Sequence, residues 1–147
     1  DQITSAILPT GSVLQVVQAT LNTAFSTTST SFVDLTGLSA AITPSNSSNK
    51  ILCLMALTIG QSTELGKNVE ILRDSTSICT TRDYVGANNW EGSTAILMFE
   101  DSPSSTSSIT YKVRIMVTGA GTLYVNRAGN QSTPLFTSSL ILMEIAG

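Results

Sequence analysis

The stretch ITYKVRIMVT, residues Ile109–Thr118, gives the clearest secondary-structure signal in the chain. Its apolar and polar side chains alternate with a period of two. Because successive side chains of a β-strand point to opposite faces, this pattern predicts a strand with one face in a core and the other in solvent. We expect Val113 and Ile115 to point inward and Lys112 and Arg114 outward, since a slip of one residue would bury both charges.

The rest of the chain repeats this design in short segments. Runs rich in Val, Ile, Leu and Thr alternate with clusters of Ser, Asn, Gly and Pro, a spacing typical of all-β sandwiches and barrels. Two runs, ILCLMALTI (Ile51–Ile59) and SLILMEI (Ser139–Ile145), are apolar at nearly every position, which predicts strands covered on both faces. The sequence therefore predicts a jelly-roll-like antiparallel β-sandwich of eight to ten strands without a helix.

Turn residues predict two hairpins. Asp-Ser-Thr separates Asn68–Arg73 from Ser77–Thr80, and Gly-Ala-Gly separates Ile109–Thr118 from Thr122–Asn126. Both triplets are of the kind that reverses a chain between strands. We expect each flanking pair to form an antiparallel hairpin.

The length of 147 residues suits one domain. We expect an N-terminal arm or linker at Asp1–Thr10 and a single sandwich over Gly11–Gly147. Within it, a Thr-Gly turn predicts separate strands at Ser31–Leu35 and Leu38–Thr43. Because the sequence starts at Asp1 without a methionine, we expect a processed chain or a piece of a longer protein.

Charge is sparse in this chain. Charged residues make up 12% of it against about 25% in an ordinary soluble domain, whereas serine and threonine together number 42. The net charge is −3 and the seven Lys and Arg residues are scattered singly, so no basic stripe for nucleic acid exists. The run Ile51–Ile59 is about half the length of a membrane-spanning helix. We expect neither a nucleic-acid partner nor membrane insertion.

The composition also argues against an enzyme. The chain has no histidine, which excludes Ser/His/Asp and Cys/His catalysis and removes the commonest zinc ligand. We expect no cofactor, and no metal, because the acidic residues lack calcium-loop spacing. Cys53 and Cys79 are predicted to be free thiols, although pairing across neighbouring strands stays open. A remote alternative is a secreted glycan-processing enzyme with Asp83 facing Glu91 across a loop.

The segment RDYVGANNWEGS, Arg82–Ser93, is the candidate recognition site. It contains the only tryptophan of the chain among amides, a carboxylate and glycines. An aromatic face with planar amides and carboxylates is what binds the C–H groups and hydroxyls of a sugar. The alternative is that the tryptophan plugs the end of the sandwich or a subunit contact. The predicted receptor or glycan contacts are Asp83, Tyr84, Asn88, Asn89 and Trp90.

The apolar excess predicts self-assembly. Ile51–Ile59 and Ser139–Ile145 carry more apolar residues than a lone sandwich has room to bury, and such surplus usually marks a subunit interface. We expect one face of Ile51–Ile59 to pack on the core and the other on a neighbouring copy. The predicted assembly is a homotrimer of jelly rolls with the C-terminal strand near its axis.

Several segments, in matching order, resemble small β-rich virion structural proteins and tail-fibre tip domains of tailed phages that infect aquatic bacteria such as cyanobacteria. The resemblance spans Gly11–Gly147 and fits least well over Gln61–Gly92. The segments that carry it are GSVLQVVQ (Gly11–Gln18), FSTTSTSFVDLTGLS (Phe25–Ser39), ITPSNSSNKIL (Ile42–Leu52), DSP (Asp101–Pro103), TYKVR (Thr110–Arg114), TLYVNR (Thr122–Arg127) and LILMEIAG (Leu140–Gly147).

This resemblance implies a non-enzymatic component of a phage virion, located in the tail fibre or on the capsid exterior and in contact with other virion proteins. The first interpretation is a tail-fibre tip domain that contacts a host surface glycan or receptor. The alternative is a capsid decoration or cement protein whose arm, Asp1–Thr10, lies on the major capsid lattice. The sequence leaves the position on the particle open.

Overall fold

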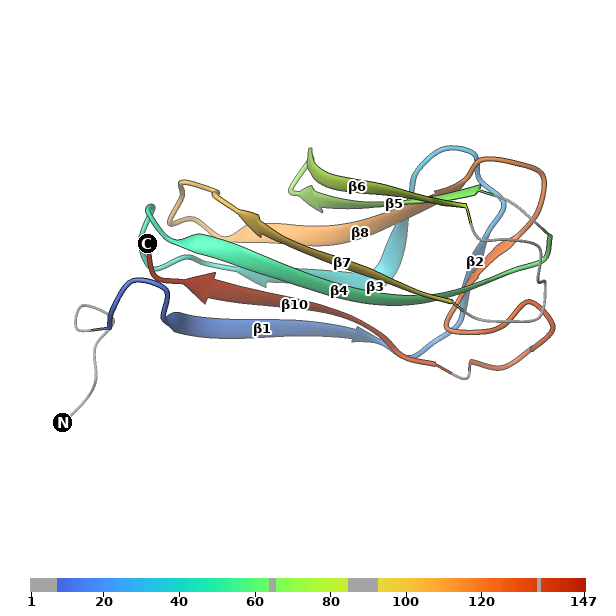
Figure 1. Ribbon diagram of the computed structural model, residues 1–147, viewed down its shortest axis with the longest axis horizontal. Helices are drawn as coiled ribbons and strands as arrows, with labels where there is room; N and C mark the ends of the chain where they lie inside the picture. The colour runs from blue at the N-terminus through green and yellow to red at the C-terminus, as the bar shows by residue number, and fades with distance from the viewer. Residues whose placement is uncertain (1–7, 64–65, 85–92, 135) are drawn as a thin grey trace.

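A computed structural model describes residues 8–63, 66–84, 93–134 and 136–147, which form ten β-strands and no helix (Figure 1). Consequently, no helix long and apolar enough to cross a membrane occurs in this part of the chain. The strands are β1 (Val13–Leu21), β2 (Phe25–Thr27), β3 (Val33–Ile42), β4 (Lys50–Gln61), β5 (Gly66–Arg73), β6 (Thr76–Tyr84), β7 (Ser93–Asp101), β8 (Ile109–Val117), β9 (Leu123–Val125) and β10 (Ser138–Ile145).

The strands form two sheets that stack as the layers of a sandwich (Figure 1). Sheet A has the order β1-β10-β4, with β7 on the other side of β4 and the short strands β9 and β2 continuing beyond the end of β10. Sheet B has the order β3-β8-β5-β6. All pairings are antiparallel, so each sheet can present one face to the core and one outward.

The pairing pattern is nested. β1 pairs with β10, β3 with β8, β4 with β7, and β5 with β6, as in one long hairpin folded at its middle. The hairpin is rolled up so that β10 also pairs with β4 and β8 with β5. Eight strands wrapped in this way form a jelly roll. The predicted fold class is therefore confirmed.

Alternate side chains of the central strands fill the space between the sheets. Along β8, Val113, Ile115 and Val117 are fully buried, whereas the side chains of Lys112 and Arg114 are 32% and 29% exposed. This is the predicted register. On β4, one face is buried as expected, through Ile51, Cys53, Met55, Leu57 and Ile59.

Two local predictions are wrong. β3 runs unbroken over Val33–Ile42, because Gly37 at φ 93° introduces an irregularity between Asp34 and Ser39 rather than a turn. β8 and β9 form no hairpin, since β9 crosses to sheet A and pairs with β2 and β4. A Gly-Ala-Gly connection permits a reversal, but the sheet that β9 joins is decided by partners distant in sequence.

Other local predictions are confirmed. Asn68–Arg73 and Ser77–Thr80 lie in the β5–β6 hairpin, where Asp74 takes the left-handed conformation at φ 51° that a tight turn needs. Both cysteines are free, with Cys53 in the core and Cys79 half-buried. Burial raises the pKa of the Cys53 thiol to about 12, so this thiol stays protonated at neutral pH. The division into an arm and one domain stays a prediction, because residues 1–7 lie outside the described ranges.

The register of β8 is testable by a pair of substitutions. Ile115→Ala should lower the free energy of unfolding by about 2–5 kcal/mol, because it leaves a cavity in a fully buried site. Lys112→Ala removes a surface ion pair with Asp34 at 2.9 Å and should cost about 0–1 kcal/mol. Urea denaturation of both variants measures the difference, and equal costs would contradict this register.

Candidate functional site

The predicted recognition segment joins the two sheets at one end of the sandwich. Its flanking strands are β6, which ends at Tyr84 in sheet B, and β7, which begins at Ser93 in sheet A. Lys67 of β5 is 2% exposed and donates a hydrogen bond from Nζ to Ser93 Oγ at 2.9 Å. A buried cation therefore lies at the point where the segment rejoins the sandwich.

The predicted contact residues fall into two groups. The backbones of Asp83 and Tyr84 belong to β6, where they pair with Lys67 and Gly66 of β5. Asn88, Asn89 and Trp90 lie outside the described residues. The grouping of these five residues into one site thus stays a prediction.

The strand pairing shows at which end of the sandwich this segment begins and ends. Ser93 pairs with Ile59 near the end of β4, whereas Ile145 pairs with Lys50 at its start. The 12 residues of β4 span about 40 Å at the rise of an extended strand. The recognition segment therefore begins and ends at the opposite end of the sandwich from Gly147 (Figure 1).

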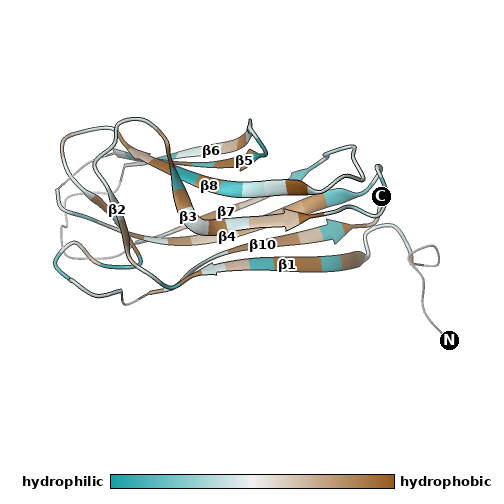
Figure 2. Ribbon diagram, turned by 180° about the vertical axis from the view of Figure 1, so that it is seen from behind, coloured by the Kyte–Doolittle hydropathy of each residue, from teal (hydrophilic) through white to brown (hydrophobic). Residues whose placement is uncertain are grey.

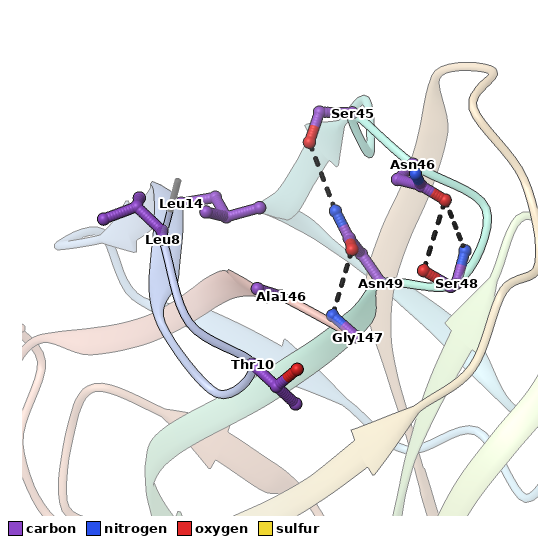
Figure 3. Close-up of a pocket in the computed structure, with 9 residues that line it drawn as sticks. All are labelled: Leu8, Thr10, Leu14, Ser45, Asn46, Ser48, Asn49, Ala146 and Gly147. Atoms are coloured by element: carbon purple, nitrogen blue, oxygen red, sulfur yellow. Dashed lines mark hydrogen bonds between the residues drawn. The ribbon is translucent and has the colours of Figure 1, made fainter. Parts of the chain in front are cut away.

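A polar pocket of about 320 Å³ lies at the terminal end of the sandwich (Figure 3). It is formed by the chain before β1, the start of β1, the β3–β4 connection and the last residues after β10. The residues that line it are Leu8, Thr10, Leu14, Ser45, Asn46, Ser48, Asn49, Ala146 and Gly147.

Hydrogen bonds within the wall occupy much of the polar lining of this pocket. Asn46 Oδ1 accepts from the backbone N–H and the hydroxyl of Ser48, and Asn49 Oδ1 accepts from the Gly147 N–H (Figure 3). Asn49 Nδ2 also donates to Ser45 Oγ at 3.2 Å. Since the polar groups of these side chains already form hydrogen bonds with one another, their role is to hold the β3–β4 connection and the C-terminal residues together.

The buried side chain of Glu144 connects several residues that lie around this pocket. It is 1% exposed, and its carboxylate accepts hydrogen bonds from Gln15 Nε2 at 2.6 Å and Asn49 Nδ2 at 2.6 Å. It also accepts from the backbone N–H and the hydroxyl of Ser45, at 2.6 and 2.8 Å. Burial by itself would raise the pKa of Glu144, but these four hydrogen bonds outweigh it and lower the pKa below the ordinary value.

The carboxylates of Asp101 and Asp74 are held by partners within the sandwich. Asp101 forms an ion pair with Arg73 at 2.9 Å and accepts a hydrogen bond from the buried Tyr111 hydroxyl at 2.7 Å. Asp74 Oδ1 accepts from the Thr110 N–H. Among the described residues, no cluster of three or more carboxylates and thiolates could hold a metal ion.

The two outward faces of the sandwich differ in chemistry. On sheet B, Asp34, Glu70, Lys112 and Arg114 form a network in which Arg114 also stacks over Phe32. On sheet A, the outward residues of β1, β10, β4 and β7 are mainly apolar. Figure 2 shows teal segments on β8, whereas β4 and β10 are brown or tan along most of their length.

Apolar residues form a diagonal band across the outer face of sheet A, in cross-strand rows that also contain polar residues: Glu100 in the first, Gln18 in the second, and Thr20 and Ser139 in the third. One row joins Val16, Met143 and Leu52, and the next joins Ile141, Leu54 and Met98. Ala56 and Ile96 lie side by side in the third. The most exposed apolar residues of sheet A are Val13 (51%), Val16 (56%), Ile96 (73%) and Met98 (69%).

Sequence reasoning found only part of this face. It assigned Ile51–Ile59 and Ser139–Ile145 to an apolar surface, but it did not assign Ala95–Phe99 of β7, which contributes Ile96 and Met98, to that surface. The signal was available in AILMF (Ala95–Phe99), where apolar residues occupy both faces of a short strand.

Among known proteins, only solved structures showed similarity to this chain. No known protein family and no curated protein matches this sequence. The chain is similar to the structure of infectious bursal disease virus Gt strain, with 17% identity and a TM-score of 0.49 over 90% of this chain and 38% of that one. It is also similar to the VP2 subviral particle of the same virus, with 17% identity and a TM-score of 0.46 over 90% and 38%.

A third similar structure is that of the T=1 particles derived from this virus, with 18% identity and a TM-score of 0.45 over 92% of this chain and 37% of that one. The chain thus spans less than two-fifths of the length of these viral chains. Because every one of these TM-scores is below 0.5, the fold assignment rests on the strand order of this chain itself.

The Glu144 cluster predicts a specific pH dependence of stability. Because the pKa of Glu144 is lowered in the folded state, its contribution is present above the pKa of an unfolded glutamate, about 4.3, and is lost as the pH falls through the folded-state value. Glu144→Gln places an amide against the donor groups and should cost about 1–3 kcal/mol at pH 7. The difference from the wild type should shrink below pH 4.

Urea denaturation between pH 7 and pH 3 measures this difference. Glu100→Gln on the exposed surface is the matched control and should leave stability nearly unchanged. A difference between wild type and Glu144→Gln that stays constant down to pH 3 would show that the charge of Glu144 contributes nothing.

Proposed function

We propose that this chain is a non-enzymatic structural protein of a phage virion, a tail-fibre tip domain that assembles as a homotrimer and contacts the host surface. The apolar outer face of sheet A carries this proposal. A contiguous apolar surface across four strands is costly in water and is expected where a protein is covered by a partner. The jelly roll also suits the role, because viral capsid domains and lectins use this architecture.

The placement of the recognition segment supports a tip domain. The chain enters and leaves at the end of the sandwich that holds Leu8 and Gly147, whereas Tyr84 and Ser93 lie at the other end. A domain attached at its terminal end would therefore direct the segment between β6 and β7 away from the particle. Loops on a rigid scaffold are the usual place for binding residues.

The chemistry of this segment favours a glycan or a glycan-bearing receptor. Tyr84 and Trp90 supply aromatic faces for sugar C–H groups, and Asp83, Asn88 and Asn89 supply groups that bind hydroxyls. The competing role for Trp90 is to close the end of the sandwich or a subunit contact. Substitution of Trp90 separates the two roles, because the structural role affects assembly and the binding role does not.

A capsid decoration protein is the second candidate. The N-terminal arm Asp1–Thr10 would lie on the major capsid lattice, and it joins the sandwich beside the polar pocket, where the Gly11 N–H donates to the Ala146 carbonyl at 2.9 Å. Copy number and position in a density map of the particle distinguish the two. A few copies at the fibre ends support the tip domain, whereas many copies on the head overturn it in favour of decoration.

Light scattering tests the trimer. At micromolar concentration the protein should have three times the chain mass, because the outer face of sheet A is covered by neighbouring copies. Leu54→Lys places a charge in the middle of this face and should dissociate the assembly. Thr110→Lys, exposed on the outer face of sheet B, is the matched control and should leave the mass unchanged. A folded wild-type monomer would contradict the trimer.

Trp90→Ala tests recognition. Removal of an aromatic anchor from a binding centre costs about 2 kcal/mol or more, so adsorption to host cells or to the glycan should weaken by roughly 30-fold. Phe32→Ala removes an aromatic ring from the outer face of sheet B and should leave adsorption unchanged. If Trp90→Ala instead prevents formation of the trimer, the tryptophan is structural.

A further inference from the structure

The edge strands of the two sheets differ in how they are protected. An edge strand presents unpaired N–H and C=O groups to any other strand, and proteins usually guard it with a bulge, a charge, a proline or a short length. In the described part of the chain, the edges are β1, β2 and β7 in sheet A and β3 and β6 in sheet B.

Four of these edges carry such a guard. β2 is only three residues long. β1 has a register shift between Val13 and Gln15, and β3 has one between Asp34 and Ser39. The pair of β5 and β6 has a shift between Ile71 and Leu72, and β6 also carries the exposed Arg82.

β7 is the least protected of these edges, because its only charges, Glu100 and Asp101, lie at its C-terminal end. It pairs with β4 over nine consecutive residues, from Ser93 opposite Ile59 to Asp101 opposite Ile51, without any register shift. Its first seven residues, STAILMF, include no charge, proline or glycine. Its outward side chains include Ile96 and Met98, the two most exposed large apolar residues among those described. β7 therefore has the regular and apolar character of a strand that pairs on both edges.

We propose that β7 pairs in antiparallel orientation with β7 of a second copy of this chain, so that two copies of sheet A become one continuous sheet. Two identical edges form a closed contact about a two-fold axis, in which each residue pair occurs twice. With full overlap of nine residues the axis passes through Leu97. Ile96 then lies opposite the partner's Met98, and Thr94 lies opposite the partner's Glu100.

The charges of β7 favour this orientation. Its acidic residues, Glu100 and Asp101, lie together at one end, where Asp101 forms an ion pair with Arg73 and Glu100 is exposed. Antiparallel pairing places them opposite Thr94 and Ser93 of the second copy, whereas parallel pairing would place like charges side by side, which is destabilising. The centre of the contact then holds only apolar residues, which continue the apolar rows of β4 and β10 across the axis.

This contact goes beyond the proposed trimer. A three-fold assembly covers the outer face of sheet A, whereas the two-fold contact uses the backbone edge of β7. Within a virion it would join copies that belong to neighbouring trimers. The two contacts can therefore fail independently.

Disulfide cross-linking tests the pairing and its register. Ile96→Cys and Met98→Cys chains, each also carrying Cys79→Ser, are mixed in equal amounts and oxidised. Directly opposite residues lie within the Cα separation that a disulfide allows, about 4.4–6.8 Å, whereas diagonal neighbours lie beyond it. The mixture should give a covalent dimer on a non-reducing gel, and either variant alone should give little.

Two further mixtures check the register. Thr94→Cys with Glu100→Cys should also cross-link, because this pair lies opposite in the same register. Ile96→Cys with Glu100→Cys is out of register and should not. Equal cross-linking in all mixtures would indicate random collision and would overturn the pairing.

Hydrogen exchange supplies a readout that does not depend on cysteine. The amides of β7 that point away from β4 should exchange more slowly in a concentrated sample than in a dilute one, because the second copy accepts their hydrogen bonds. Exchange that is independent of concentration overturns the pairing. A trimer without cross-links overturns the pairing and leaves the proposed trimer standing, whereas a monomer at every concentration overturns both.

Discussion

The nested pairing of strands that are distant in sequence is the constraint on which the rest of this structure depends. β1 pairs with β10, and every later pair lies inside this one until the β5–β6 hairpin closes the series. Bringing together strands that are distant in sequence costs chain entropy. The burial of apolar side chains in the core offsets this cost, because alternate residues of the central strands β4 and β8 are removed from water together.

The same pairing brings together the hydrogen-bonded cluster around Glu144, at the end of the sandwich that holds Gly147. Gln15, Ser45 and Asn49 reach Glu144 only because β1 and the β3–β4 connection lie beside β10. A buried carboxylate without partners would be strongly destabilising, but four short hydrogen bonds make the charged form the favoured one. These hydrogen bonds fix the end of the sandwich that holds Leu8 and Gly147, whereas β6 ends and β7 begins at the other end.

The contrast between the two outward faces links the fold to the proposed role. The outer face of sheet B is polar and carries ion pairs around Arg114, which are stable in contact with water. Sheet A presents Ile96, Met98 and Val16 together with half-buried residues of β4 and β10. One solvated face and one apolar face on a rigid sandwich are what an assembling subunit requires.

The sequence by itself determined the alternation of β8, the burial of one face of β4, the tight turn at Asp74 and the all-β class, because each depends on side-chain periodicity or on the backbone preference of a few neighbouring residues. It also pointed to the apolar surplus of β4 and β10. The tertiary structure alone decided that β3 continues through Gly37, that β9 leaves β8 for sheet A, that Glu144 meets Ser45, and that β7 is a regular edge strand with charges at one end only. These features depend on which strand lies beside which, and that choice is made by burial summed over the whole core rather than by any local stretch of residues.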